Sequence, residues 1–173
     1  MKSTFSQLLL LLLVSVVLSL GVNAISPHGI DLIGKYRDLS NSEGPVPPPT
    51  AQEDDPPFIE INVAQMEHAA GQALFVDARN PEEFECGTIP GSINVPFEAL
   101  PEGDLAPYFD SVLAVPKDRM LIVFCSGEEC DLSLHLARNL KLQNYTNLAI
   151  FFGGAREWEK FGLELQRRKS CGN

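Results

Sequence analysis

Short apolar runs alternate with more polar stretches along the last two thirds of the chain. Five of these runs are predicted to form strands, at residues 58–63, 73–77, 92–96, 120–124 and 147–152. Helices are predicted between and after them, at residues 64–70, 81–86, 105–113, 130–142 and 155–161. Strands separated by helices indicate an α/β domain with a mainly parallel, five-stranded sheet. In such sheets, ligands bind beyond the carboxyl ends of the strands.

A different pattern occupies the N-terminus, where a long apolar run follows Lys2. Residues 8–22 are almost entirely apolar, and a run of this length after a positive charge predicts a secretory signal peptide. Extended to residues 5–25, the run approaches the ~20 residues that span a bilayer. Residues 1–25 are therefore predicted to be a signal peptide or a membrane anchor. In both cases the rest of the chain is expected outside the cytoplasm, in the periplasm or another extracytoplasmic space.

The remaining segments follow from composition. Residues 26–57 are predicted to be a Pro-rich linker, because the proline run at 45–49 favours an extended conformation. The folded domain is predicted at residues 58–166, and a short tail at residues 167–173.

Charge and cysteine content narrow the function classes. The chain has 173 residues and a net charge of −10, with no basic stripe of the kind that binds nucleic acid, so no nucleic-acid partner is predicted. The four cysteines lack the spacing of a zinc site, and neither a metal nor a cofactor is predicted. Cys86 is expected to be a core thiol, and no partner is predicted for Cys171 in the tail.

The main candidate for chemistry is Cys125, which opens a short acidic loop between a predicted strand and a predicted helix. Backbone N–H groups and the positive end of the helix dipole converge at such a turn and stabilise a thiolate. Cys125 is therefore the predicted catalytic nucleophile. The predicted active-site loop also contains Ser126, Gly127, Glu128, Glu129 and Asp131.

Cys130 follows Cys125 by five positions and gives the loop a second thiol. The turn could bring the two Cα atoms near the ~5.5–6 Å that a disulfide prefers, so Cys130 is a candidate resolving or redox partner. The alternative is a small buried residue at the start of a helix. The carboxylates of Glu128, Glu129 and Asp131 are expected to raise the pKa of Cys125 and to repel anions such as thiosulfate, phosphate and arsenate.

Three motifs in order resemble the rhodanese-like sulfurtransferase domain over about residues 58–166. They are residues 77–96, residues 122–125 with the following helix, and residues 152–158. The resemblance implies a doubly wound α/β domain with flanking helices, and a Cys125 that carries sulfane sulfur as a persulfide. The Cys-x4-Cys loop and the Pro-rich spacer are similar to an exported or membrane-tethered variety of the family.

Two positions depart from the family pattern. The related phosphatases and arsenate reductases need an Arg where this chain has Asp131, which disfavours both activities. Thr88 stands where the family usually has His. In the first motif, Asp77 and Arg79 are predicted to form the pocket rim, with Arg79 paired to Asp77 or Glu83.

Three functions remain open from the sequence. The first is sulfur transfer through a Cys125 persulfide, from a donor to a thiol acceptor, each a small molecule or a protein. The second is a thiol-disulfide relay of Cys125 and Cys130 that serves a membrane redox partner. The third is a non-catalytic binding module, which the retained Cys125 disfavours.

Overall fold

The computed structural model describes residues 2–25, 47–127 and 129–171. The chain divides into two units, and the boundary between them in the sequence follows residue 39. Predicted linker residues 26–46 and loop residue Glu128 lie outside this description. In the first unit, helix α1 (Lys2–Ile25) includes an 18-residue window, Ser6–Asn23, of mean hydropathy 2.1 with no buried residue. The helix is long and apolar enough to cross a membrane, and a signal sequence has the same length and composition.

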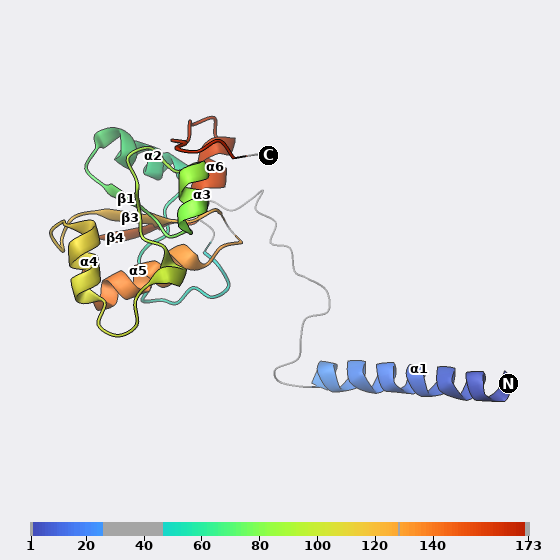
Figure 1. Ribbon diagram of the computed structural model, residues 1–173. Coiled ribbons are helices and arrows are strands. Elements are labelled where there is room, and N and C mark those ends of the chain that lie inside the picture. The colour runs from blue at the N-terminus through green and yellow to red at the C-terminus, as the bar shows by residue number, and fades with distance from the viewer. Residues whose placement is uncertain (1, 26–46, 128, 172–173) are drawn as a thin grey trace. The chain divides into compact units, whose positions relative to one another are not determined.

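The second unit is an α/β domain built on a parallel sheet with strand order β2-β1-β3-β4 (Figure 1). The strands are β1 (Leu74–Asp77), β2 (Ile93–Asn94), β3 (Leu121–Phe124) and β4 (Leu148–Phe151). The helices are α2 (Ile61–Ala70), α3 (Pro81–Cys86), α4 (Ala106–Leu113), α5 (Leu132–Leu142) and α6 (Gly154–Lys160), and a 3-10 helix spans Phe97–Ala99. The predicted fold class is confirmed.

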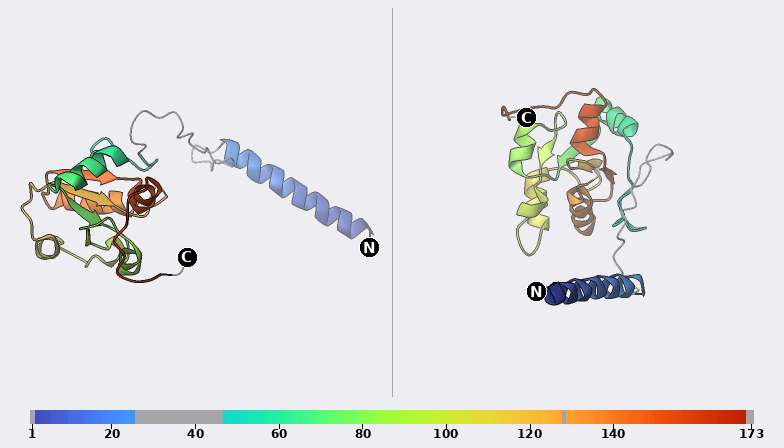
Figure 2. Two further views of the ribbon diagram at one scale, coloured as in Figure 1. Left: turned by 90° about the horizontal axis from the view of Figure 1, so that it is seen from above. Right: turned by 90° about the vertical axis from the view of Figure 1, so that its right-hand side faces the viewer.

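Helices cover both faces of the sheet, because successive side chains of each strand point to opposite sides (Figures 1 and 2). On one face, Val123 and Ile150 pack with side chains of α4 and α5. On the other face, Ile122 and Phe151 pack with side chains of α2 and α6. Burial on both faces explains why the strands read as continuous apolar runs.

The first of the five predicted strands, residues 58–63, is wrong beyond its first residue. Only Phe58 pairs with the sheet, as an isolated parallel bridge to Ile150. Helix α2 already begins at Ile61, because Ile61 and Ala64 are spaced to face the same side of a helix and are both buried. The sheet of the described chain therefore has four strands and one bridge.

The last part of the predicted linker, residues 47–57, packs on the domain. Arg138 of α5 donates to the Asp55 carboxylate with an Nε–Oδ1 distance of 2.6 Å. The Thr50 hydroxyl donates to the Asp131 carboxylate at 3.1 Å. The folded chain therefore starts earlier than the predicted boundary at residue 58.

The C-terminal tail is also fixed, by a disulfide between Cys86 at the end of α3 and Cys171. The backbone N–H groups of Arg168 and Lys169 both donate to the Glu85 carbonyl. The expectation that Cys86 is a free core thiol is therefore wrong. Its position at the open end of α3, next to the returning tail, makes it available for the cross-link.

Candidate active site

Cys125 lies directly after β3, at the carboxyl end of a central strand, where the sequence predicts it. The start of α6 closes around the loop that Cys125 opens. The Ala155 N–H donates to the Cys125 carbonyl at 2.9 Å, and the Arg156 N–H donates to the Ser126 carbonyl at 3.0 Å. These bonds tie the predicted catalytic residue to the glycine turn before α6.

Gly154 makes this close approach possible. Its φ is +60°, and a Cβ atom at this position would lie 2.2 Å from the Cys125 carbonyl oxygen. A side chain would therefore meet both unfavourable backbone geometry and a direct clash. Glycine at this position lets α6 begin against the loop.

The sulfur of Cys125 is enclosed and protonated in the resting structure. Cys125 has no exposed surface. Its Sγ lies 2.7 Å from the Cys130 carbonyl oxygen and 3.8 Å from that of Gly127, while the Ser133 hydroxyl donates to it at 3.5 Å. The hydrogen bond to Cys130 and then burial raise the pKa of Cys125, since a thiolate would face two carbonyl oxygens without water. The predicted stabilised thiolate at Cys125 is therefore wrong for this resting structure.

The pKa of Cys130 shifts in the opposite direction. The neighbouring Cys125 and, to a smaller extent, Ser126 and the backbone of Leu132 lower the pKa of Cys130 to about 6, although burial opposes this. Cys130 is half-buried and is the more acidic of the two loop thiols.

The Cys125 thiol donates to the Cys130 carbonyl. The opposite pKa shifts of the two thiols favour a proton on Cys125 and negative charge on Cys130. Both cysteines are free. The pair is thus a reduced dithiol with an asymmetric charge.

The described acidic residues of the loop have other partners. Glu129 lies 3.6 Å from Arg156 in an exposed ion pair, and Asp131 accepts from Thr50. The rise in the Cys125 pKa, which the sequence attributes to carboxylates, is caused first by Cys130 and then by burial. Glu128, the third predicted carboxylate, lies outside the described residues.

Asp77 and Arg79 form a buried pair, as one of the two predicted pairings requires. Arg79 donates from Nε at 2.9 Å and from Nη2 at 2.6 Å to the Asp77 carboxylate, and from Nη2 to the Gly87 carbonyl at 2.7 Å. Burial disfavours the charged guanidinium, but Asp77 outweighs this and raises the pKa of Arg79. The Thr88 hydroxyl completes the group with a bond of 2.8 Å to Asp77, which gives this departure from the family pattern a structural role.

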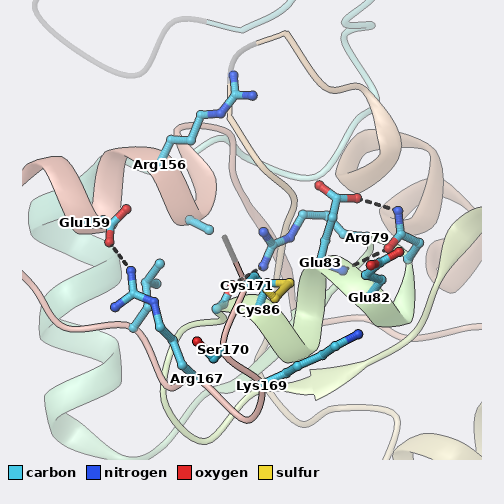
Figure 3. Close-up of a pocket in the computed structure, with 14 residues that line it drawn as sticks. Arg79, Glu82, Glu83, Cys86, Arg156, Glu159, Arg167, Lys169, Ser170 and Cys171 are labelled. Atoms are coloured by element: carbon cyan, nitrogen blue, oxygen red, sulfur yellow. Dashed lines mark hydrogen bonds and ion pairs between the residues drawn. A yellow bond between two sulfur atoms is a disulfide. The ribbon is translucent and has the colours of Figure 1, made fainter. Parts of the chain in front are cut away.

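A cleft of about 660 Å³ lies beside the loop, between α3, α6 and the C-terminal tail (Figure 3). Arg79 and the Cys86–Cys171 disulfide line it, and it reaches Ala155, whose N–H donates to the Cys125 carbonyl. The predicted rim position of Arg79 fits this cleft. Asp77 has no exposed surface and lies beneath Arg79, so its predicted rim position is wrong.

Sequence reasoning missed the contact that Ser133 makes with Cys125. The available signal was the position of Ser133 in the first turn of a helix that follows a cysteine loop. Within residues 2–25, 47–127 and 129–171, no group of three or more His, Cys, Asp or Glu side chains is placed to hold a metal ion.

Known proteins of similar sequence and structure include sulfurtransferases. Thiosulfate:glutathione sulfurtransferase of Homo sapiens is 34% identical over 97 residues, which cover 52% of this chain and 82% of the relative. The mitochondrial thiosulfate sulfurtransferase RDL2 of Saccharomyces cerevisiae is 30% identical over 112 residues, covering 60% and 72%. The structure of the human single-domain sulfurtransferase TSTD1 superposes with a TM-score of 0.51 at 25% identity, covering 60% of this chain and 96% of that one.

These relatives support a rhodanese-type sulfurtransferase. The model of the rhodanese-like domain matches residues 62–161, which is more than half of the sequence and includes both loop cysteines. The chain therefore belongs to the rhodanese-like domain family.

Proposed function

We propose that Cys125 accepts sulfane sulfur from a donor as a persulfide and passes it to a thiol acceptor. The observation that carries this proposal is the free Cys125 at the carboxyl end of β3, in a loop closed by the start of α6. Because Cys125 is buried and protonated at rest, loading requires loss of its proton. The loading rate therefore increases with pH.

The charge of the loop bears on the donor. Glu129 is exposed and Asp131 is half-buried, so both contribute negative potential near the two cysteines. This potential opposes the approach of dianionic thiosulfate, which the names of the relatives contain. We propose a neutral or protein-bound sulfane donor, with a small-molecule or protein thiol as the acceptor.

The site of action is proposed to be outside the cytoplasm. Helix α1 has the length and composition of a signal or an anchor. The Cys86–Cys171 disulfide supports an oxidising compartment, because such bonds persist mainly in exported proteins. In a tethered form, the domain would be available to a membrane redox partner.

The test is intact mass with peptide mapping of the full chain, before and after exposure to thiosulfate or inorganic polysulfide. Gain of one sulfur atom on Cys125 at early times, before a thiol removes it, is the expected result, and Cys125→Ser should abolish this gain. Comparison of the two donors measures the effect of the acidic loop. Sulfur gain that persists in Cys125→Ser at the same level would contradict the proposal.

A second candidate is a thiol-disulfide relay, which two free cysteines in one loop favour, with Sγ of Cys125 2.7 Å from the Cys130 carbonyl oxygen. The relay would cycle between dithiol and disulfide without sulfane sulfur. A chain that at no time gains sulfur on Cys125 and releases no hydrosulfide with either donor, yet forms and breaks a Cys125–Cys130 disulfide, would select this function.

A further inference from the structure

The second thiol of the loop, Cys130, lies against the residue proposed to carry the persulfide. The Sγ atom of Cys125 is 2.7 Å from the Cys130 carbonyl oxygen, and both cysteines are free. Cys130 directly precedes Asp131, the N-cap of α5, so it lies where the free N–H groups of a helix start favour negative charge.

The two cysteines differ in exposure and in acidity. Cys130 is half-buried, whereas Cys125 has no exposed surface. The pKa of Cys130 is lowered and that of Cys125 is raised. Within the loop, Cys130 is thus the more accessible and the more readily ionised cysteine.

We infer that Cys130 is an internal acceptor that resolves the Cys125 persulfide, releases hydrosulfide and leaves a Cys125–Cys130 disulfide. This inference rests on the proposed function, because it needs sulfane sulfur on Cys125. It adds a second catalytic residue and identifies the product of the transfer.

The step balances in atoms and electrons. The Cys130 thiolate attacks Sγ of the Cys125 persulfide, a bond forms between the two cysteine sulfurs, and the bond to the outer sulfur breaks. The outer sulfur leaves with its hydrogen and the electron pair as HS⁻, so it is reduced while the Cys130 sulfur is oxidised and the Cys125 sulfur keeps its oxidation state. A dithiol reductant, or two equivalents of a monothiol, then returns the pair to its starting state.

Proximity favours this route over attack by an external thiol. Two thiols in one short loop meet at an effective concentration of at least the order of millimolar. The persulfide bond is formed on a sulfur that already lies 2.7 Å from the Cys130 carbonyl oxygen, so the two residues are held together in one turn before the attack. The lowered pKa of Cys130, about 6, keeps its nucleophilic form populated at neutral pH.

The experiment compares the full chain with its Cys130→Ser variant. Each protein is incubated with thiosulfate or inorganic polysulfide, alkylated at intervals and mapped by mass, and hydrosulfide is measured against a protein-free blank. In the unsubstituted chain, we expect a Cys125–Cys130 disulfide and one more hydrosulfide per chain than in Cys130→Ser, beyond what loading from polysulfide itself releases. In Cys130→Ser, we expect a Cys125 persulfide that lasts at least about tenfold longer, with no hydrosulfide when thiosulfate is the donor.

The outcomes separate this inference from the proposed function. Sulfur gain on Cys125 that is equally long-lived in both proteins, or sulfur that maps to Cys130, would overturn the inference and leave sulfur transfer intact. If neither protein gains sulfur on Cys125 or releases hydrosulfide with either donor, the proposed function itself fails. The double variant Cys86→Ser/Cys171→Ser is the control, because Cys171→Ser alone would free the Cys86 thiol. Its hydrosulfide yield should equal that of the unsubstituted chain.

Discussion

Cys86 and Cys171 are joined by a disulfide across 85 residues of sequence, with their Cα atoms 5.5 Å apart. The bond attaches the C-terminal tail to the end of α3 and lines the cleft beside the active-site loop (Figure 3). The second cysteine pair, Cys125 and Cys130, is free. The four cysteines of the chain therefore form one oxidised pair and one reduced pair.

Removal of the disulfide should lower stability. We expect Cys171→Ser to reduce the free energy of unfolding by about 2–4 kcal/mol, because the cross-link restricts the unfolded chain. Urea denaturation without reductant measures the effect. Added reductant should bring the unsubstituted chain down to the stability of the variant and leave the variant unchanged. Equal urea midpoints for the two oxidised proteins would contradict this prediction.

The two loop cysteines should differ in their reaction with iodoacetamide. Cys130 should be alkylated first, because its pKa is lowered to about 6 while that of buried Cys125 is raised. The thiolate fraction of Cys130 increases with pH, so its alkylation rate should rise with a midpoint near pH 6. Timed alkylation with peptide mapping checks the order, and faster labelling of Cys125 at pH 7 would refute the assignment.

Loss of one member of the buried Asp77–Arg79 pair should be costly. Arg79→Gln leaves the Asp77 carboxylate buried with fewer donors, and we expect a loss of roughly 3–5 kcal/mol in the free energy of unfolding. Arg156→Gln is the matched control, because Arg156 and Glu129 form an exposed pair expected to contribute about 0–1 kcal/mol. Similar urea midpoints for the two variants would rule out the expected difference.

The stability that the contact between residues 47–57 and α5 contributes should depend on pH. Arg138 lowers the pKa of Asp55 below its usual 3.8, although burial opposes this. A carboxyl group of this kind adds stability that is complete above its unfolded pKa and is lost as pH falls through its lower folded pKa. Asp55→Asn should therefore cost roughly 1.5–3 kcal/mol at pH 7, and the difference should shrink below pH 3.8.

The control for Asp55 is its neighbour. Asp54 is 79% exposed and lies 3.6 Å from Lys141, so Asp54→Asn should change stability by no more than about 1 kcal/mol. Unfolding curves at several pH values compare the two variants. A pH-independent cost for Asp55→Asn down to pH 2 would count against the ion pair.

Gly154 should be the less replaceable of two glycines with positive φ. Gly162 has a φ of +84° and no atom near an added Cβ. Gly162→Ala should therefore lower the free energy of unfolding by only about 1–2 kcal/mol, the cost of a left-handed backbone for a residue with a side chain. Gly154→Ala should lose clearly more, because its Cβ would clash with the Cys125 carbonyl. Sulfur loading on Cys125, measured for both variants, should be reduced only in Gly154→Ala. Equal loading in the two variants would exclude a role for this contact in shaping the loop.

Much of the architecture is predictable from local signals. The bounds of α3 follow from Pro81 at its first turn and from Asn80, whose side chain caps the Glu83 N–H. The strands of the sheet centre follow from their apolar runs. The failed strand near Phe58 has apolar residues that suit either period, and only packing of Ile61 and Ala64 decides for a helix.

The site is less predictable, because its chemistry depends on where backbone groups point. The sequence identifies Cys125 and Cys130, but the burial of Cys125 and its bond to the Cys130 carbonyl follow from the path of the loop. The Cys86–Cys171 bond depends on a tail that returns to α3 across the whole domain. Neither relationship leaves a periodic pattern in the sequence.

The bridge at Phe58 has a practical consequence for protein production. Ile59 N–H donates to the Ile150 carbonyl at 2.9 Å, and the Ile150 N–H donates to the Pro57 carbonyl at 2.9 Å. These bonds cover the outer edge of β4, which would otherwise offer unpaired backbone groups to other chains. An expression fragment trimmed to the family match, starting at residue 62, would lose this cover and is expected to aggregate. A fragment that begins at residue 47 retains it.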